Sequence, residues 1–214
     1  MPANKPYVIG LTGGIGCGKS EAAQYLKSLG AAHIDADAIS RALTGDPRAT
    51  GDPVFGAALP EVRRVFGEAV FTPEGSLDRK ALAGRVFSDP AARRALEGII
   101  HPLVQRTMLE RMDAAAREGA RIVILDVPLL FETGMDALCD ETWVVYAGRE
   151  QQIARVLARD GLAREAAEAR VDSQMSSEER IARATCAIST DRPVEKTRAE
   201  LEQLYRSALK RAEA

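Results

Sequence analysis

The chain has 214 residues, of which 46% are hydrophobic and 28% charged, so it is long enough for a sizeable core in one domain with an elaboration. Its formal net charge of −2 gives no general attraction to nucleic acid, and no run approaches the roughly 18 apolar residues of a membrane helix. The first residues hold no signal-peptide core, and the three cysteines form no CxxC pair. We therefore expect a cytoplasmic protein with reduced thiols that binds neither nucleic acid nor membrane. A monomer is expected, with a weak homo-oligomer as the alternative.

The first strong signal is a glycine-rich loop between an apolar run (residues 7–11) and a helix-like segment (residues 19–29). Residues 13–20 read GGIGCGKS and fit the spacing GxxxxGKS. Glycines let successive backbone N–H groups face one point, and the helix start adds its unpaired N–H groups and positive dipole end. A glycine-rich turn that precedes Lys and Ser by chance is the alternative, but the strand-then-helix context favours a nucleoside triphosphate site. Residues expected to bind ATP phosphates are Gly14, Ile15, Gly16, Cys17, Gly18, Lys19 and Ser20, the last also holding Mg²⁺.

A second short strand, residues 32–37, ends in two carboxylates, Asp35 and Asp37. Residues two apart on a strand point the same way, so both would face the sheet edge where the glycine-rich loop lies. We expect Asp37 to accept the proton of an attacking hydroxyl and Asp35 to serve Mg²⁺, with the reverse assignment as the alternative. Helix capping by one of them would not exclude catalysis. Arg41, four residues after Asp37, would share its face if both lie in one helix.

The middle of the chain lacks strand alternation. Residues 44–60 are rich in Gly, Pro and Asp, which is typical of a loop or hinge. Helices are predicted afterwards, with Asp78 and Asp89 as caps before the second and third; their ranges are 59–66, 78–87, 90–96 and 102–117. This block therefore predicts a helical insertion between the strands of a parallel sheet.

Two nearly continuous apolar runs, residues 121–126 and 141–146, predict strands buried on both faces. Asp126 ends the first of them and is a Walker-B-like candidate for Mg²⁺, with a capping or turn aspartate as the alternative. A last short strand at residues 186–188 precedes an amphipathic helix that would cover the sheet. Strands alternating with helices predict an α/β fold with a doubly wound parallel sheet of about five strands, and with nucleotide at their carboxyl ends.

The segment between the last two strands is helical and dense in arginine. A solvated face is the ordinary interpretation of such arginines, but Arg155 and Arg159 are four residues apart and would line one side. Charges that meet two anionic substrates only when both are bound are typical of a closing lid. Of the two histidines, we expect His33 to pack and His101 to start a helix near the acceptor.

Several motifs occur in a fixed order along the chain. They are residues 9–20, 34–37 with Arg41, 75–82, 96–104, 125–132, and a segment with Arg155, Arg159, Arg164 and Gln174. Together they resemble the dephospho-coenzyme A kinase family over nearly the full length. The His-Pro segment at 101–102 and the sequence DVPLLFE at 126–132 are the most specific of them.

The resemblance implies ATP-dependent phosphorylation of the ribose 3′-hydroxyl of dephospho-CoA, which gives CoA and ADP, with Mg²⁺ as cofactor. It implies a core (residues 1–43, 119–149 and 185–214), a helical acceptor domain (44–118) and a lid (150–184). In this family pattern Lys19 and Ser20 hold phosphates and Mg²⁺, and Asp37 is the base. Arg155 is the lid residue that meets ATP. Candidates on the acceptor side are Asp37, Arg41, Arg79, His101, Leu129 and Arg159.

The chain departs from the family pattern in three places. Residues 44–60 are longer and richer in Gly and Pro than the pattern, so the bounds of the acceptor domain are not fixed by the resemblance. Glu21 stands where a small or hydroxyl residue is common, although its backbone N–H can still serve the α-phosphate. Residues 188–192 (ISTDR) replace the Asn-x-Gly pattern beside the adenine, so the contacts to the base are not predicted.

Two other functions are alternatives to this one. A P-loop kinase for another small hydroxyl acceptor, such as a nucleoside, a nucleotide or a sugar-like acid, shares the donor half of the site. A regulatory GTP-binding switch would need the motifs NKxD and DxxG, and neither string occurs in the sequence.

Overall fold

The computed structural model describes residues 5–213, which form two compact units. One unit combines the chain up to Ile34 with the chain from Met112 onward, and the other is Asp35–Arg111. The predicted division into core, acceptor domain and lid is finer than this and stays a prediction. No helix in the described range is long and apolar enough to span a membrane.

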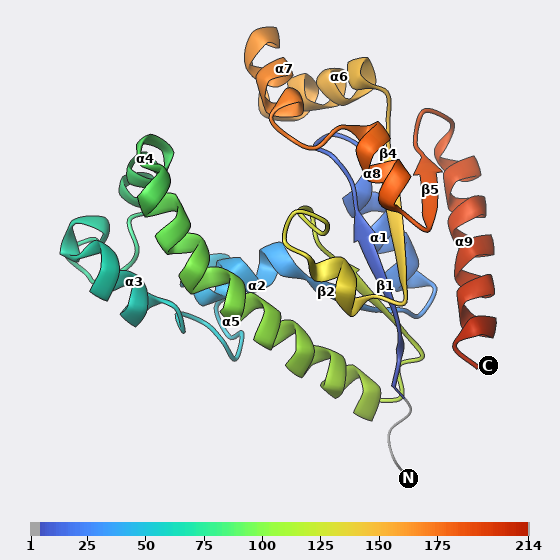
Figure 1. Ribbon diagram of the computed structural model, residues 1–214, viewed down its shortest axis with the longest axis horizontal. Helices are drawn as coiled ribbons and strands as arrows, with labels where there is room; N and C mark the ends of the chain where they lie inside the picture. The colour runs from blue at the N-terminus through green and yellow to red at the C-terminus, as the bar shows by residue number, and fades with distance from the viewer. Residues whose placement is uncertain (1–4, 214) are drawn as a thin grey trace. The chain divides into compact units, whose positions relative to one another are not determined.

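A five-stranded sheet organises the first unit, with strand order β2-β3-β1-β4-β5 (Figure 1). Its strands are β1 (Tyr7–Thr12), β2 (Ala32–Asp35), β3 (Ile122–Asp126), β4 (Glu141–Tyr146) and β5 (Cys186–Ser189). β1 pairs in parallel with β3 on one side and β4 on the other, and β4 pairs in parallel with β5. β3 is buried at every position, as expected of a strand covered on both faces. The predicted α/β parallel sheet is confirmed.

Helices α1 (Lys19–Ser28) and α9 (Val194–Arg211) pack on one face of this sheet. Every second residue of the strands points to that face, so Ile9 of β1 and Trp143 of β4 join the same core cluster as Leu26 of α1 and Leu201 of α9. The two helices also contact each other. Because α1 starts at the carboxyl end of β1, this packing fixes the glycine-rich loop against the sheet.

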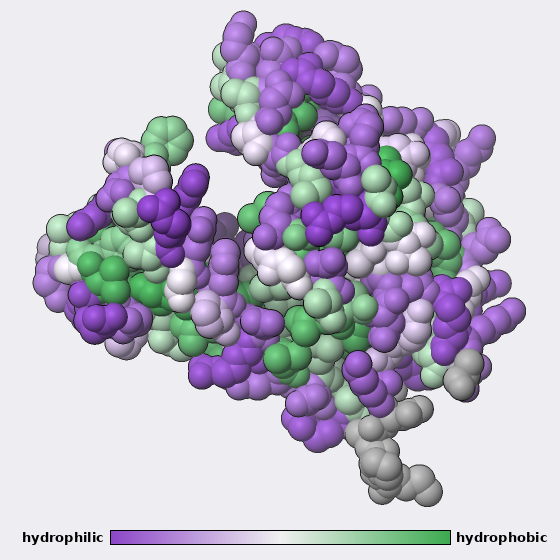
Figure 2. All heavy atoms as spheres, viewed as in Figure 1, coloured by the Kyte–Doolittle hydropathy of each residue, from purple (hydrophilic) through white to green (hydrophobic). Residues whose placement is uncertain are grey.

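Three further helices of the first unit follow β4 and precede β5 along the chain: α6 (Arg149–Asp160), α7 (Arg164–Asp172) and α8 (Ser177–Arg183). A small cluster of Ile153, Val156 and Ala167 joins α6 to α7. Hydrophilic residues cover most of these two helices on the face shown in Figure 2. α8 begins with a capping box in which Ser176 and Glu179 satisfy each other's backbone N–H groups.

The second unit is built from helices. They are α2 (Ala36–Leu43), η1 (Pro47–Ala49), α3 (Leu59–Phe66), η2 (Glu68–Val70), α4 (Arg79–Ser88) and most of α5 (Pro90–Arg117), while the short η3 (Met135–Leu138) belongs to the first unit. Asp78 caps α4 as predicted, since its side chain accepts from the N–H groups of Lys80 and Ala81.

The prediction of two helices at 90–96 and 102–117 was wrong, because α5 runs without a break through Pro102. Proline supplies no N–H to the carbonyl four residues earlier and should weaken a helix. Buried side chains recur every fourth residue on both sides of it, at Ile100, Val104, Met108 and Met112. This continuous buried stripe outweighs the missing hydrogen bond, so His101 does not start a helix.

The prediction of a strand over residues 32–37 was wrong at its end. β2 stops at Asp35, whose Oδ1 accepts from the N–H of Ala38 at 2.9 Å and so starts α2 at Ala36. Asp37 consequently lies in the first turn of a helix. The strand argument for two carboxylates on one face does not apply.

Candidate active site

The glycine-rich loop connects β1 to α1 and depends on glycine at several positions. Gly16 and Gly18 have φ values of 74° and 86°, in the left-handed region that favours glycine. A Cβ at Gly13 would lie 2.3 Å from the carbonyl oxygen of Val145, and one at Gly16 would lie 2.7 Å from that of Gln152. The loop is therefore packed tightly against its neighbours, with no room for side chains at Gly13 and Gly16.

Lys19 follows this loop and forms an ion pair with Asp126, the last residue of β3. Nε2 of His33 lies 3.2 Å from the other carboxylate oxygen of Asp126. Burial alone would raise the pKa of Asp126, but the hydrogen bond of His33 and the charge and hydrogen bond of Lys19 outweigh it and hold that pKa below its ordinary value. Asp126 is thus a buried, ionised carboxylate. The contact of His33 was not foreseen, because it joins residues 93 apart in sequence.

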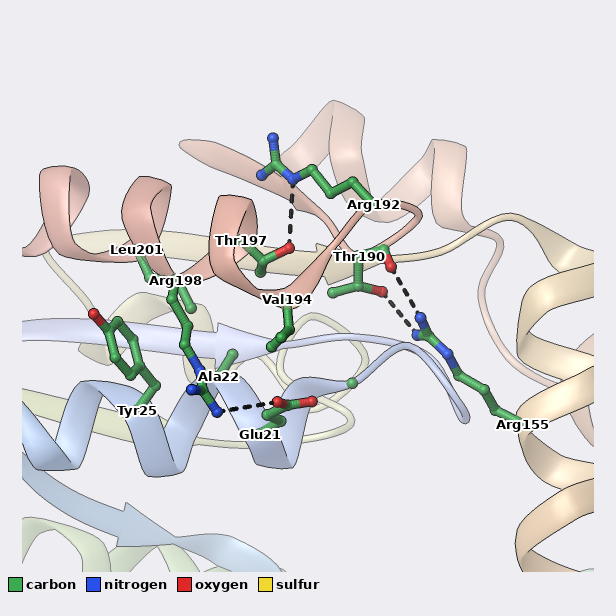
Figure 3. A pocket seen from close by; sticks show the side chains of 11 residues that line it. Glu21, Ala22, Tyr25, Arg155, Thr190, Arg192, Val194, Thr197, Arg198 and Leu201 are labelled. Atoms are coloured by element: carbon green, nitrogen blue, oxygen red, sulfur yellow. Dashed lines mark hydrogen bonds and ion pairs between the residues drawn. The ribbon is translucent and has the colours of Figure 1, made fainter.

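Arg155 of α6 reaches the loop through a hydroxyl that the sequence had not singled out. Its Nη1 donates to Oγ1 of Thr190 at 2.8 Å and its Nη2 donates to the carbonyl of Thr190 at 2.9 Å (Figure 3). The same Nη1 also donates to the carbonyl of Gly16 at 3.1 Å. The Thr190 hydroxyl in turn donates to the carbonyl of Cys17 at 2.8 Å. One hydroxyl therefore joins α6, the loop and the segment after β5. The only sequence signal was that Thr190 lies in the stretch that departs from the family pattern.

A pocket of about 200 Å³ opens beside this contact, between α1 and α9 (Figure 3). Its residues are Gly18, Glu21, Ala22, Tyr25, Arg155, Thr190, Arg192, Val194, Thr197, Arg198 and Leu201. Arg198 lies 3.4 Å from the carboxylate of Glu21 across it. This pocket places part of the departing segment, residues 188–192, beside the phosphate loop.

The thiol of Cys17 is buried under the loop, with 1% of the residue exposed. Burial raises the pKa of this thiol, so it is a neutral packing group at physiological pH. Cys17, Cys139 and Cys186 are all free thiols.

Several predicted residues belong to the second unit. The carboxylate of Asp35 caps α2 and lies 3.6 Å from Arg41, while Asp37 lies in the first turn of α2. Nη2 of Arg79 donates to the carbonyl and the hydroxyl of Thr44, at 3.0 Å each. Arg79 and His101 line one cavity of about 330 Å³, so the structure brings these two acceptor-side candidates together.

Three other predicted residues, Arg159, Leu129 and Ser20, are exposed. Arg159 forms an ion pair with its neighbour Asp160 at 2.7 Å. Leu129 is 44% exposed on the turn that follows β3. Ser20, in the first turn of α1, is exposed at the loop's end.

A parallel sheet whose first strand leads through GGIGCGKS into a helix, with the loop lysine paired to an aspartate at the end of a neighbouring strand, defines a P-loop kinase fold. A shikimate kinase from Acinetobacter baumannii shares this fold, with a TM-score of 0.52 at 17% identity over 98% of both chains. The dephospho-CoA kinase family profile matches residues 7–195. The chain belongs to the dephospho-CoA kinase family.

Relatives with known sequences and structures agree. The chain is 46% identical to a dephospho-CoA kinase of Symbiobacterium thermophilum, over 94% of this chain and 81% of that one. It is 48% identical to one of Anaeromyxobacter dehalogenans, over 83% and 80%. The solved structure of TT1252 from Thermus thermophilus matches with a TM-score of 0.78 at 38% identity, covering 94% and 97%. The structure of the dephospho-CoA kinase from Campylobacter jejuni matches with a TM-score of 0.62 at 26% identity, covering 95% of this chain and 98% of that one.

Proposed function

We propose that this protein transfers the γ-phosphoryl group of ATP to the ribose 3′-hydroxyl of dephospho-CoA, which yields CoA and ADP in the last step of CoA biosynthesis. The observation that carries this proposal is the family match over residues 7–195. It is supported by a complete phosphate loop in which Lys19 and Arg155 are both in contact with neighbouring groups of the donor site.

On the donor side, loop N–H groups from Gly14 to Lys19 would hold the phosphates, and Lys19 would move from Asp126 to the β- and γ-phosphates. Its side chain is held by a single carboxylate oxygen, so the exchange replaces one charge partner by another. Arg155 would remain close to the loop and face the nucleotide. Phosphoryl transfer needs such positioning and neutralisation of charge more than covalent help from the protein.

Mg²⁺ would be held by the Ser20 hydroxyl and by Asp126 once Lys19 leaves it. Hydroxyl and carboxylate oxygens are the donors that this hard cation takes, together with phosphate oxygens and water. Within residues 5–213 no group of three acidic, histidine or cysteine side chains forms a cage, which agrees with a metal held mainly by the nucleotide. Asp35 is a further candidate, although one of its oxygens caps α2. The bound ion would neutralise charge on the phosphates.

On the acceptor side, Asp37 would take the proton of the 3′-hydroxyl as its oxygen forms a bond to the γ-phosphorus. The bond from that phosphorus to the bridging oxygen of ADP breaks, and ADP leaves with the electron pair. Arg41, Arg79, His101, Leu129 and Arg159 are proposed to hold the rest of the acceptor. Support is strongest for Arg79 and His101, which share a cavity.

The experiment is an assay with purified protein, ATP and Mg²⁺ in which dephospho-CoA is offered beside a nucleoside, a nucleotide and shikimate. We expect turnover with dephospho-CoA to exceed every other acceptor by at least 100-fold in kcat/KM, because buried polar groups built for one acceptor reject others by factors of about 10⁴. Equal or better use of another acceptor would point to the alternative P-loop kinase. A chelator control should abolish the activity if Mg²⁺ is required.

We take the working form to be a cytoplasmic monomer. The free state of all three cysteines supports a reducing compartment. Light scattering of the purified protein tests the oligomeric state.

A further inference from the structure

Arg180 of α8 is a buried cation that the functions described so far do not use. Only 2% of it is exposed. Its Nη1 donates to the carbonyl of Met175 at 2.6 Å, and its Nη2 lies 3.4 Å from Oε1 of Glu132. Its Nε has no partner anywhere in residues 5–213. A guanidinium offers five N–H groups, so a buried arginine with one distant carboxylate is incompletely satisfied.

The guanidinium lies beside the first half of the phosphate loop. A Cβ added to Gly14 would come within 3.2 Å of its Nη1 and within 2.9 Å of the amide nitrogen of Gln152. Arg180, Gly14 and Gln152 together line a cavity of about 360 Å³. The cavity therefore opens onto loop residues where triphosphate is expected to bind.

The same cavity holds a second contact to the loop. Oε1 of Gln174 accepts from the N–H of Ile15 at 2.8 Å. Gln174 immediately precedes Met175, whose carbonyl Arg180 holds. Arg180 thus contacts the residue next to a glutamine that binds the loop. Its unpaired N–H groups are close to the loop as well, because its Nη1 lies near Gly14.

Other charged groups around the cavity are already engaged or point elsewhere. Arg149 pairs with Asp172 at 2.8 Å, and Asp191 accepts from the N–H of Gly148 at 2.6 Å. Glu178, on the exposed side of α8, also lines the cavity. Arg180 is accordingly the buried cation in this cavity with donors to spare.

We propose that Arg180 binds the terminal phosphate of the bound nucleoside triphosphate and stabilises the charge on it during transfer. Loop N–H groups and Lys19 approach that phosphate from one side, and Arg180 would complete the set from the side of Gly14. A planar guanidinium suits phosphate oxygens, and donors placed where charge develops act strongly in a site that excludes water. The inference rests on the proposed ATP-dependent transfer but not on the identity of the acceptor.

A structural role is the competing explanation, since Arg180 joins α8 to the carbonyl of Met175 and to Glu132. The two explanations differ in which nucleotide they affect. A structural brace would influence ATP and ADP alike, whereas a ligand of the terminal phosphate distinguishes them.

The test is Arg180→Met, which keeps the length of the side chain and removes the charge. Dissociation constants would be measured by titration calorimetry for ADP and for a non-hydrolysable ATP analogue, both with Mg²⁺. We expect the analogue to bind roughly 10- to 100-fold more weakly, as for loss of a hydrogen bond to a charged group, and ADP to change by less than about twofold. Turnover should fall by about 10²–10³, the usual effect of removing one donor to developing charge.

Arg183→Met is the matched control on the same helix. Arg183 stacks over the ring of Phe131 at 4.6 Å and does not line the cavity, so both dissociation constants should stay unchanged. Arg180→Lys supplies a second variant that keeps a cation in case the Met variant fails to fold. Arg180→Lys should preserve the affinity for ADP and weaken binding of the ATP analogue by a factor between those of the parent and Arg180→Met.

Equal weakening of ADP and the analogue, or unchanged affinity for both, in whichever Arg180 variant folds would overturn the proposal. The binding measurement is separate from the acceptor assay. If the protein does not phosphorylate dephospho-CoA but Arg180→Met loses affinity for the ATP analogue alone, the proposed acceptor is refuted and this inference is upheld. If it phosphorylates dephospho-CoA but the variant shows no such selective loss, the acceptor is upheld and this inference is refuted.

Discussion

The two ends of the same parallel sheet each hold a buried carboxylate, but the two carboxylates have different kinds of partner. At the amino end, Glu141 of β4 accepts from the hydroxyl of Tyr7 at 2.7 Å and from Nε1 of Trp143 at 2.8 Å, and it pairs with Arg211. At the carboxyl end, Asp126 is shared between Lys19 and His33. Lys19 is also the residue that we expect to leave Asp126 and bind the β- and γ-phosphates of ATP.

The difference lies in how completely the polar groups are satisfied. The cluster around Glu141 closes on itself within strands β1 and β4 and helix α9, which is what a structural network requires. At the carboxyl end the cations Lys19, Arg155 and Arg180 outnumber the single buried carboxylate, and Nε of Arg180 has no partner among the described residues. The amino end therefore stabilises the fold, and the carboxyl end is prepared for an anion.

The largest effect is expected from the carboxylate that follows the carboxyl end of β2. Asp37→Asn should lower turnover by about 10²–10⁴, the usual contribution of a general base, and leave ATP affinity nearly intact. Steady-state kinetics and ATP titration on the same preparation measure this. Near-normal turnover in Asp37→Asn together with a loss in Asp35→Asn would reverse the roles assigned to the two residues.

The amino end should show the opposite behaviour. Glu141→Ala leaves the buried N–H of Trp143 and the hydroxyl of Tyr7 without their acceptor, so the free energy of unfolding should fall by about 1–3 kcal/mol. Turnover per folded molecule should not change. Chemical denaturation and kinetics would be compared with Glu150→Ala, which breaks a surface pair with Arg164 and should leave the free energy of unfolding nearly unchanged. A catalytic defect in folded Glu141→Ala would break the comparison.

A smaller effect is expected at the hydroxyl that joins Arg155 to the loop. Thr190→Val removes it at constant size and should raise the KM for ATP about fivefold, the equivalent of one hydrogen bond, whereas Thr190→Ser should behave like the parent. In an Arg155→Met background the valine change should add less than it does in the parent, because the hydrogen bond between Arg155 and the hydroxyl is already lost and the one to the Cys17 carbonyl is left. Full additivity would show that Thr190 acts independently of Arg155.

The smallest effect concerns pH. Burial would raise the pKa of Glu141, but hydrogen bonds from Trp143, Tyr7 and Arg211 and the charge of Arg211 hold it below its ordinary value of 4.5. The stability that its charged form contributes is therefore present above about pH 4.5 and is lost as pH falls through the lower, folded-state pKa. Below pH 4.5, the free energy of unfolding should therefore fall more steeply with decreasing pH in the parent than in Glu141→Gln, as measured by denaturation at a series of pH values. Identical slopes would show that this carboxylate does not titrate with folding.

Local signals in the sequence predicted much of the sheet and the phosphate loop. β4 and α3 have the predicted bounds, and Lys19 lies where its motif puts it. Buried strands are continuous apolar runs, and the loop is a fixed spacing of glycines, so both can be recognised from neighbours along the chain.

Contacts between distant segments could not be predicted in this way. His33 meets Asp126, Arg155 meets Thr190 and Arg180 meets Glu132 across gaps of 93, 35 and 48 residues. Arg180 looked like one more exposed arginine, because its burial depends on how α8 packs. The end of β2 was missed for a local reason, since Asp35 serves as a helix cap.

The central claim is phosphoryl transfer to one particular hydroxyl, and the position of the phosphate in the product tests it most directly. Phosphorus–proton correlation NMR of the product from ATP, Mg²⁺ and dephospho-CoA should place the new phosphate on the ribose 3′ carbon, with one ADP formed per product. A phosphate at another position, or ADP released without any phosphorylated acceptor, would contradict the account.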